Sequence, residues 1–212
     1  MRLKPAKDII GVFGTRGSGK TVWIRQTIVN LPRVIVLENG NEEYDDICNL
    51  KAYSKEELAE CLLDRGKFHI LYTNTEVGDI EALDEMCEIA RAYTADVYQR
   101  FNVSLPISLI IDEAQNYTSP WKTSQTFRKS IMQSRHFDFN IIYSTQRPSQ
   151  ISRNLTSQSS KFIIYNLVEN TDVKFFYSFI GADASYIPAL RKYHYLDCNL
   201  SNREVIEKML NY

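Results

Sequence analysis

The feature that most constrains this chain is the eight-residue stretch from Gly14 to Thr21, which reads G-x-x-x-x-G-K-T. Residues 8–13 just before it, DIIGVF, are a β-branched and aromatic run typical of a buried strand. Residues 22–29 just after it are typical of a helix. The backbone N–H groups of such a loop, with the N-terminus of the following helix, bind phosphate groups. The stretch therefore predicts a nucleotide-binding loop, or P-loop, between a strand and a helix.

The residue types in this loop suit a bound nucleotide. Glycines let the backbone approach phosphates without a Cβ clash. Lys20 is expected to direct its charge at the β- and γ-phosphates, and the Thr21 hydroxyl is expected to bind Mg²⁺. A chance glycine-rich turn is the alternative, and the strand and helix on either side argue against it. The expected nucleotide-binding residues are Gly14, Thr15, Arg16, Gly17, Ser18, Gly19, Lys20, Thr21 and Val22.

Length and composition are those of an ordinary globular protein. The 212 residues suffice for a full core, so we expect a single domain over residues 1–212. The net charge is −1, so any nucleic-acid site has to be local. The first seven residues lack the apolar segment of a signal peptide, and no apolar run is long enough for stable membrane insertion. The four cysteines and three histidines do not have the spacing of a zinc site.

Strand-like and helix-like segments alternate, which favours a parallel sheet covered on both faces. We predict an α/β, three-layer P-loop NTPase fold with a mostly parallel central sheet and the nucleotide at the carboxyl ends of its strands. The core is expected over residues 8–180, followed by a C-terminal extension over residues 181–212. The expected strands are residues 8–13, 33–37, 67–73, 107–111, 139–145, 161–166 and 193–196. The expected helices are residues 22–29, 54–64, 79–101, 124–135 and 171–179, with a final helix beginning at Ser201.

Two acidic residues follow the apolar run at residues 109–111 and complete the string LIIDE. About ninety residues after a P-loop, this is the Walker B pattern. Asp112 is expected to hold Mg²⁺, directly or through water. Glu113 is expected to orient or deprotonate the water that attacks the γ-phosphate. Many strands end in acidic residues, so the pattern indicates a Walker B site only because a P-loop precedes it in the sequence.

Gln146 supplies a third polar signal, in the string STQRP at residues 144–148. A polar residue at the end of the strand beside the P-loop strand can reach the γ-phosphate and sense its loss. Taken alone, a polar residue before a proline turn is a common arrangement.

The P-loop, the DEAQ string at residues 112–115 and the STQRP string occur in an order that resembles the FtsK/HerA superfamily of hexameric DNA-pumping ATPases. The residues EEY at 42–44 also resemble an acidic element of that superfamily. The compact size resembles the genome-packaging ATPase branch of viruses with double-jelly-roll capsids. The resemblance covers about residues 9–180 and implies that Gln146 is a sensor glutamine and that the active protein is a ring.

The resemblance also implies an arginine finger, a cation that stabilises the transferring phosphoryl group of a neighbouring subunit. Arg135, eleven residues before Gln146, matches the superfamily's Gly-Arg position, although Ser134 replaces the glycine. Arg153 is a second candidate. For either residue, a solvated surface charge is the alternative.

A basic stretch after the Walker B residues is a candidate DNA surface. Lys122, Arg128, Lys129 and Arg135 fall within a short span, and Trp121 and Phe127 lie among them. Such a surface contacts phosphates without reading base sequence. An ordinary charged helix face is the equally weighted alternative.

The motifs predict an ATPase that hydrolyses ATP with Mg²⁺, and the resemblance implies that it translocates double-stranded DNA and packages a viral genome into a preformed capsid. The expected partners are DNA, further copies of the chain in a hexameric ring, and capsid or vertex proteins, in the host cytoplasm and in the virion. A cellular HerA-like or conjugative DNA-pumping ATPase and a non-motor P-loop assembly or secretion protein are alternatives. A nucleotide kinase is disfavoured because no arginine-rich lid is evident. The expected catalytic residues are Lys20, Glu113, Gln146, Arg135 and Arg153.

Overall fold

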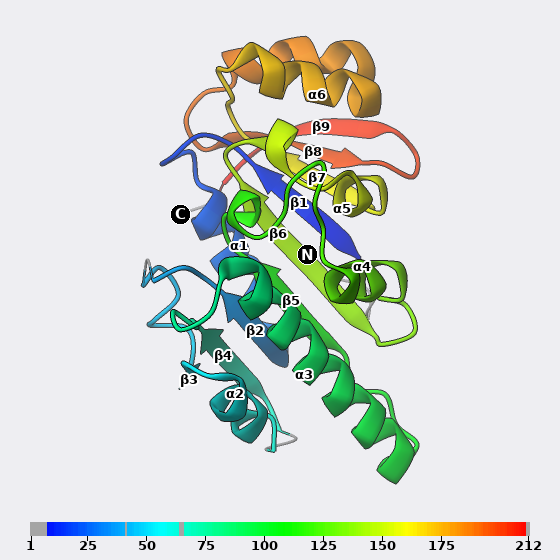
Figure 1. The fold of residues 1–212 in the computed structure, drawn as a ribbon. Coiled ribbons are helices and arrows are strands. Elements are labelled where there is room, and N and C mark those ends of the chain that lie inside the picture. The colour runs from blue at the N-terminus through cyan, green and yellow to red at the C-terminus, as the bar shows by residue number, and fades with distance from the viewer. Residues whose placement is uncertain (1–7, 41, 64–65, 211–212) are drawn as a thin grey trace.

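A computed structural model describes residues 8–40, 42–63 and 66–210, and a nine-stranded sheet forms its centre (Figure 1). Across the sheet the strands follow the order β3-β4-β2-β5-β6-β1-β7-β8-β9. The strands are β1 (Ile9–Phe13), β2 (Arg33–Leu37), β3 (Leu50–Ala52), β4 (Phe68–Tyr72), β5 (Ile107–Ile111), β6 (Phe139–Thr145), β7 (Lys161–Ile164), β8 (His194–Asn199) and β9 (Glu204–Met209).

The first seven strands in this order, β3-β4-β2-β5-β6-β1-β7, run parallel. The last two, β8 and β9, add an antiparallel edge. The predicted mostly parallel α/β sheet is confirmed. The P-loop strand β1 lies between β6 and β7, and β6 pairs on its other side with β5. The carboxyl ends of β5, β6 and β1 therefore meet at one edge, where Asp112, Gln146 and Gly14 follow them.

Helices cover both faces of the sheet, as predicted, but unequally (Figure 1). On one face α1 packs through Trp23, Ile24 and Ile28. The other face carries the remaining α-helices, which bury residues such as Met86 and Phe176 in a larger core. The helices are α1 (Lys20–Ile28), α2 (Lys55–Cys61), α3 (Asp79–Phe101), α4 (Gln125–Met132), α5 (Arg153–Ser157) and α6 (Asn170–Ile180), with the short 3-10 helices η1 (Ala114–Asn116), η2 (Pro148–Gln150) and η3 (Gly181–Ala189).

The apolar runs form strands because both of their faces are buried. In β1 all five residues are buried; Ile9 and Phe13 point into the larger core, while Ile10 and Val12 point toward α1. Burying one such aliphatic or aromatic side chain contributes about 1.5–3 kcal/mol. A run without polar alternation is the pattern that a central parallel strand requires.

The C-terminal end differs from the sequence prediction. The helix expected from Ser201 is wrong, because residues 204–209 form β9, which pairs antiparallel with β8. In the turn between them Arg203 has φ +58°, and the Asn202 side chain accepts a hydrogen bond from the Glu204 N–H at 3.2 Å. Backbone pairing with β8 thus outweighs the local helical pattern.

The sequence prediction also missed the short elements β3 and α5, which have three and five residues and carry little periodicity. The interpretation of residues 1–7 and the predicted helix end at residue 64 lie outside the described residues. Within residues 8–40, 42–63 and 66–210, no helix combines the length and the apolar character needed to cross a membrane.

Candidate active site

The P-loop leaves β1 and is tied to the strands on both sides. The Gly14 N–H donates to the Thr145 carbonyl at 3.3 Å, and the Thr15 N–H donates to the Asn166 carbonyl at 3.0 Å. A Cβ at Gly14 would lie 2.6 Å from the Cβ of Tyr165, so only glycine fits there. Gly19, with φ +116°, turns the chain into α1. The loop is therefore anchored at the carboxyl edge with the α1 N-terminus facing it.

Lys20 is buried at the first position of α1, and its side chain folds back over the loop. Its Nζ donates to the carbonyls of Gly14 at 2.9 Å and Thr15 at 3.2 Å. Burial lowers the pKa of Lys20, while the carboxylates of Glu113 and Asp112 oppose that shift. The amino group is thus bound by carbonyls that phosphate oxygens can replace.

One cavity of about 320 Å³ joins the predicted elements of the site. Its position at the carboxyl edge of the sheet is where an open α/β fold binds its ligand. The cavity brings together the P-loop, both Walker B acids and the predicted sensor. Its lining residues are Arg16, Gly17, Lys20, Thr21, Glu43, Asp112, Glu113, Gln115 and Gln146.

Asp112, just after β5, and Thr21, on α1, line this cavity, and both are oxygen donors that suit Mg²⁺. Asp112 is buried and accepts a short hydrogen bond from the Ser144 hydroxyl. Burial raises the pKa of Asp112 to about 6, and the bond from Ser144 partly counteracts this. A carboxylate destabilised by burial gains from a nearby cation, so the residues present fit a magnesium ion.

Glu113 is held from three directions. Its N–H donates to the Ser144 hydroxyl at 3.0 Å, and its backbone has φ +51°. Its Oε1 accepts from Gln146 Nε2 at 2.8 Å, and its Oε2 accepts from Gln115 Nε2 at 2.6 Å. Gln115 is positioned in turn by the Thr145 hydroxyl at 2.5 Å. Two neutral amides therefore orient the carboxylate without supplying a counter-charge.

Glu43 is a lining residue that the sequence prediction did not include among the site residues. Its Oε2 accepts a hydrogen bond from Thr21 Oγ1 at 2.5 Å. The acidic loop after β2 carries it to the start of α1, where Arg25 Nη1 also donates to the Glu43 carbonyl at 2.7 Å. The acidic run in the sequence was the available signal, but its partner depends on the fold.

Ser144 and Gln115 are two further residues absent from the predicted site. Ser144 bridges Asp112 and the Glu113 backbone, and Gln115 holds one Glu113 oxygen. Both lie within the DEAQ and STQRP strings, so the strings themselves were the signal.

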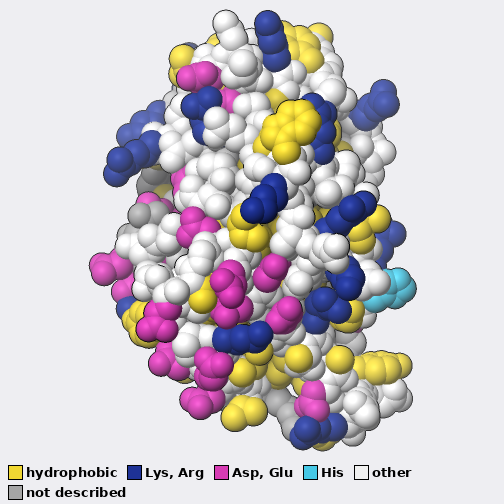
Figure 2. Space-filling view, in the orientation of Figure 1, with side chains coloured by type: hydrophobic (Ala, Val, Ile, Leu, Met, Phe, Trp, Pro, Cys, Tyr) yellow, Lys and Arg dark blue, Asp and Glu magenta, His cyan; other side chains and the backbone are white. Residues whose placement is uncertain are grey.

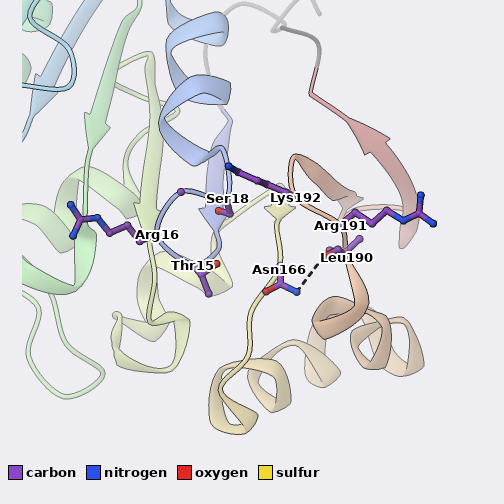
Figure 3. Close-up of a pocket in the computed structure, with 8 residues that line it drawn as sticks. Thr15, Arg16, Ser18, Asn166, Leu190, Arg191 and Lys192 are labelled. Atoms are coloured by element: carbon purple, nitrogen blue, oxygen red, sulfur yellow. Dashed lines mark hydrogen bonds between the residues drawn. The ribbon is translucent and has the colours of Figure 1, made fainter.

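A second cavity, of about 450 Å³, opens on the other side of the P-loop (Figure 3). Its walls include Thr15, Ser18 and the segment Leu190–Lys192. The Asn166 amide fixes that segment, because its Nδ2 donates to the carbonyls of Pro188 at 2.8 Å and Leu190 at 3.3 Å. In Figure 3 the Lys192 amino group extends toward the P-loop, whereas Arg191 points away from it. The cavity extends from the P-loop toward the β7 side of the sheet.

The two candidate finger arginines do not line the cavity that contains Lys20. Arg135 is exposed in the turn before β6, at the amino edge of the sheet. The seven residues of β6 separate it from that cavity by roughly 20 Å. Arg153 begins α5 and lines a different cavity, next to Trp121. Neither arginine therefore completes the site of its own chain in this structure.

The candidate DNA surface is only partly as expected. Trp121 is 95% exposed, whereas Phe127 is fully buried in the core and cannot contact a ligand. The basic side chains Lys122, Arg128, Lys129 and Arg135 are all exposed.

Comparison with solved structures shows a shared fold. The genome packaging NTPase B204 from Sulfolobus turreted icosahedral virus 2, in complex with sulfate, has a TM-score of 0.80 at 18% identity, covering 99% of each chain. Other B204 structures are complexes with AMPPCP and ATP-gammaS. VirB4 of Thermoanaerobacter pseudethanolicus has a TM-score of 0.66 at 9% identity, covering 100% of this chain and 92% of that chain.

EccC (ATPases 2 and 3) of Thermomonospora curvata, in complex with a signal sequence peptide, has a TM-score of 0.59 at 10% identity. The comparison covers 96% of this chain and 36% of that chain. No curated protein sequence matches this chain significantly. The three-layer P-loop NTPase fold that the resemblance implied is confirmed by these structures.

A family profile described as zonular occludens toxin (Zot) matches residues 9–167. This span begins at β1, includes the P-loop, Asp112, Glu113 and Gln146, and ends just after β7. It covers well over half of the 212 residues. The chain belongs to the zonular occludens toxin (Zot) family.

Proposed function

We propose that this protein is an ATPase that translocates double-stranded DNA and packages a viral genome into a preformed capsid. The observation that carries the proposal is the single cavity in which Lys20, Asp112, Glu113 and Gln146 meet. A protein that only binds nucleotide does not need an oriented carboxylate and a glutamine at the γ-phosphate position. The combination favours hydrolysis.

In the proposed reaction, the P-loop N–H groups and Lys20 hold the phosphates of ATP. Glu113 orients a water molecule and draws its proton as the oxygen attacks the γ-phosphorus. The bond from the γ-phosphorus to the β-bridging oxygen breaks, and ADP and inorganic phosphate leave. Thr21 and Asp112 would hold Mg²⁺, which neutralises charge on the β- and γ-phosphates when bound. Gln146 keeps the Glu113 carboxylate in place and can respond to loss of the γ-phosphate.

The nucleoside of ATP has room in the second cavity. That cavity begins at Thr15 and Ser18 of the P-loop and extends to Lys192, away from Glu113. A nucleotide laid across the loop would place its phosphates beside Lys20 and its sugar and base near Asn166. The two cavities share Arg16 and Gly17, which supports this orientation.

The motor part of the proposal rests on the likeness to B204, described as the DNA-packaging ATPase of its virus, over nearly the whole of both chains. We propose a head-to-tail hexameric ring in which Arg135 acts as a finger on the next subunit, with Arg153 as the second candidate. The distance between Arg135 and the cavity of its own chain supports action in trans. Capsid or vertex proteins are the proposed further partners, in the host cytoplasm and the virion.

Translocation of a polypeptide is a second candidate, because EccC has the same fold and was solved with a signal sequence peptide. The discriminating experiment measures ATP turnover without ligand, with duplex DNA and with an apolar peptide, alongside the mass of the protein in solution. A DNA motor should be stimulated by DNA, and the stimulation should fall steeply with added salt because phosphate contacts release counterions. Stimulation by peptide alone, or DNA stimulation that salt leaves unchanged, would overturn the DNA proposal. The Lys20→Ala protein supplies the background rate.

A further inference from the structure

Trp121 lies on the surface in the loop that follows the Walker B residues. It is 95% exposed, whereas the other tryptophan, Trp23, is 6% exposed in the core. A single exposed apolar side chain is common on protein surfaces, so only the residues around Trp121 can indicate a binding site. Trp121 borders a cavity of about 460 Å³ whose other walls include Ser149, Arg153, Thr171 and Lys174. The indole therefore stands where hydroxyl groups and cations adjoin the apolar side chains of Pro120, Ile151 and Phe175.

The cations of this surface are not neutralised. Within the described part of the chain, Arg153 and Lys174 form no ion pair, and both are exposed. The nearby carboxylates of Glu169 and Asp172 face Arg147 instead, at 3.8 and 3.1 Å. Figure 2 shows acidic side chains gathered at the lower left of this face, over α2 and α3, and basic ones more frequent on the right, over α4 and α5. The surface around Trp121 is locally positive although the chain as a whole is not.

Hydrogen bonds tie the three segments of this surface together. The Thr123 hydroxyl donates to the Ser152 hydroxyl at 2.6 Å, joining the Trp121 loop to the residue before α5. The Ser152 N–H donates to Thr118 Oγ1 at 3.3 Å. On α6, Asp172 accepts from the N–H and hydroxyl of Ser149 at 3.0 and 2.6 Å.

Two of these segments begin at the active site. The chain reaches Trp121 eight residues after Glu113, and it reaches Arg153 seven residues after Gln146. Glu113 and Gln146 are joined by the 2.8 Å hydrogen bond in the cavity. A ligand that moves the Trp121 loop relative to α5 therefore acts on the segments that position Glu113 and Gln146.

We propose that Trp121, Arg153 and Lys174, here called the Trp121 surface, form a contact site for a DNA strand. The cations would bind backbone phosphates, and the indole would stack on a base or pack against a sugar. A flat exposed ring beside unpaired cations is the combination that binds nucleic acid without reading sequence. The inference rests on the proposed function, and it identifies where that DNA touches the protein.

The experiment uses the intrinsic fluorescence of the full chain titrated with duplex and single-stranded oligonucleotides of equal length. Wild-type emission should be quenched on binding, and Trp121→Phe should lose the quenching because Trp23 is buried. Trp121→Ala should weaken binding at least about five-fold. Lys174→Ala should reduce the slope of log affinity against log salt by about one. Lys67→Ala, an exposed lysine at the amino end of β4, removes the same charge elsewhere and should leave binding unchanged.

The two oligonucleotide forms show which strand geometry the surface takes: stronger quenching by single strands indicates base stacking, and equal quenching indicates backbone contact. If the protein binds DNA but Trp121→Ala and Lys174→Ala bind as tightly as Lys67→Ala, the inference is overturned while the proposed function stands. If wild-type protein binds neither form, both fail. Basal ATP turnover without DNA should be the same in Trp121→Ala and wild type, so a lost basal rate would also contradict a role confined to DNA.

Discussion

Gln146 Nε2 donates to Glu113 Oε1 at 2.8 Å and so connects the ends of two adjacent parallel strands. Register explains the contact, because Ile111 pairs with Tyr143 and the chains then leave the sheet side by side. The second Glu113 oxygen is bound by Gln115. Because an amide donor binds each oxygen, the carboxylate has a fixed orientation, which a group that activates water requires.

Replacing Glu113 by Gln should leave nucleotide affinity nearly unchanged and reduce ATP turnover about a hundred-fold or more, because the charge that accepts a proton is lost. Asp112 and Thr21 remain in place to hold the metal. Steady-state turnover and equilibrium binding of a fluorescent ATP analogue measure the two effects separately. Glu60→Gln, on the exposed side of α2, is the matched control. Normal turnover in Glu113→Gln would mean that another residue positions the water.

Replacing Lys20 by Ala should reduce turnover by about a hundred-fold or more, because a preorganised cation no longer faces the phosphates. Nucleotide binding should weaken as well, since Lys20 contacts the phosphates before reaction. Lys67→Ala controls for the change in net charge. A folded Lys20→Ala protein with wild-type kinetics would contradict the assignment of the P-loop.

Replacing Glu43 by Ala should weaken Mg²⁺ binding in the presence of nucleotide by about ten- to a hundred-fold. The carboxylate accepts the Thr21 proton at 2.5 Å and so leaves the hydroxyl lone pairs free for the metal. Glu43→Gln, whose amide oxygen can still accept that proton, should retain most of the affinity. Mg²⁺ titrations of turnover give the values. Equal Mg²⁺ dependence in all three proteins would show that Glu43 does not support the metal site.

Glu38 should make the free energy of unfolding depend on pH. It is 2% exposed, its Oε1 accepts from the Glu42 N–H at 2.6 Å, and burial raises its pKa to about 7. The pKa of Glu38 is higher in the folded protein than in the unfolded protein, so its contribution to the free energy of unfolding is largest at low pH, where the carboxyl is protonated. It is lost as pH rises through the folded pKa.

Glu38→Gln removes that loss and should raise the free energy of unfolding at pH 8 by about 1–3 kcal/mol relative to wild type, with no gain near pH 4. Urea denaturation at pH 4, 6 and 8 measures the effect. Glu60→Gln, an exposed counterpart, should show no pH-dependent gain. A destabilised Glu38→Gln protein at pH 8 would mean that the charged carboxylate is needed by the loop after β2.

Subunits should share active sites. Arg135→Ala alone is expected to reduce turnover by roughly 10³-fold, as for loss of an arginine finger. Mixed assemblies of Arg135→Ala and Glu113→Gln subunits contain some interfaces with both groups intact, so activity should return in part. Unchanged turnover in Arg135→Ala would show that Arg135 is not the finger and would leave Arg153 as the candidate. Mixtures that co-assemble and remain inactive would contradict a shared site.

The phosphate loop, the Walker B strand and the strand before Gln146 could be predicted from the amino-acid sequence. Each depends on neighbours along the chain: Gly19 turns into its own helix, and the apolar run at residues 107–111 is long enough to form a buried strand. The parallel arrangement also followed, because alternating strands and helices allow few other ways to bury both faces. These local features were sufficient to predict that Lys20, Asp112 and Glu113 would meet, whereas the prediction for Gln146 also needed the family resemblance.

The packed fold was needed to show which distant groups complete that site and which structure residues 204–209 adopt. Glu43 reaches Thr21, and Ser144 reaches Asp112, because loops and strands far apart in sequence are brought to one edge of the sheet. Residues 204–209 form β9 instead of a helix because β8 offers an unpaired backbone edge. Trp121 is exposed while Phe127 is buried, although both lie in one basic stretch. Hydrogen-bond partners and burial are properties of the packed chain, and local pattern cannot specify them.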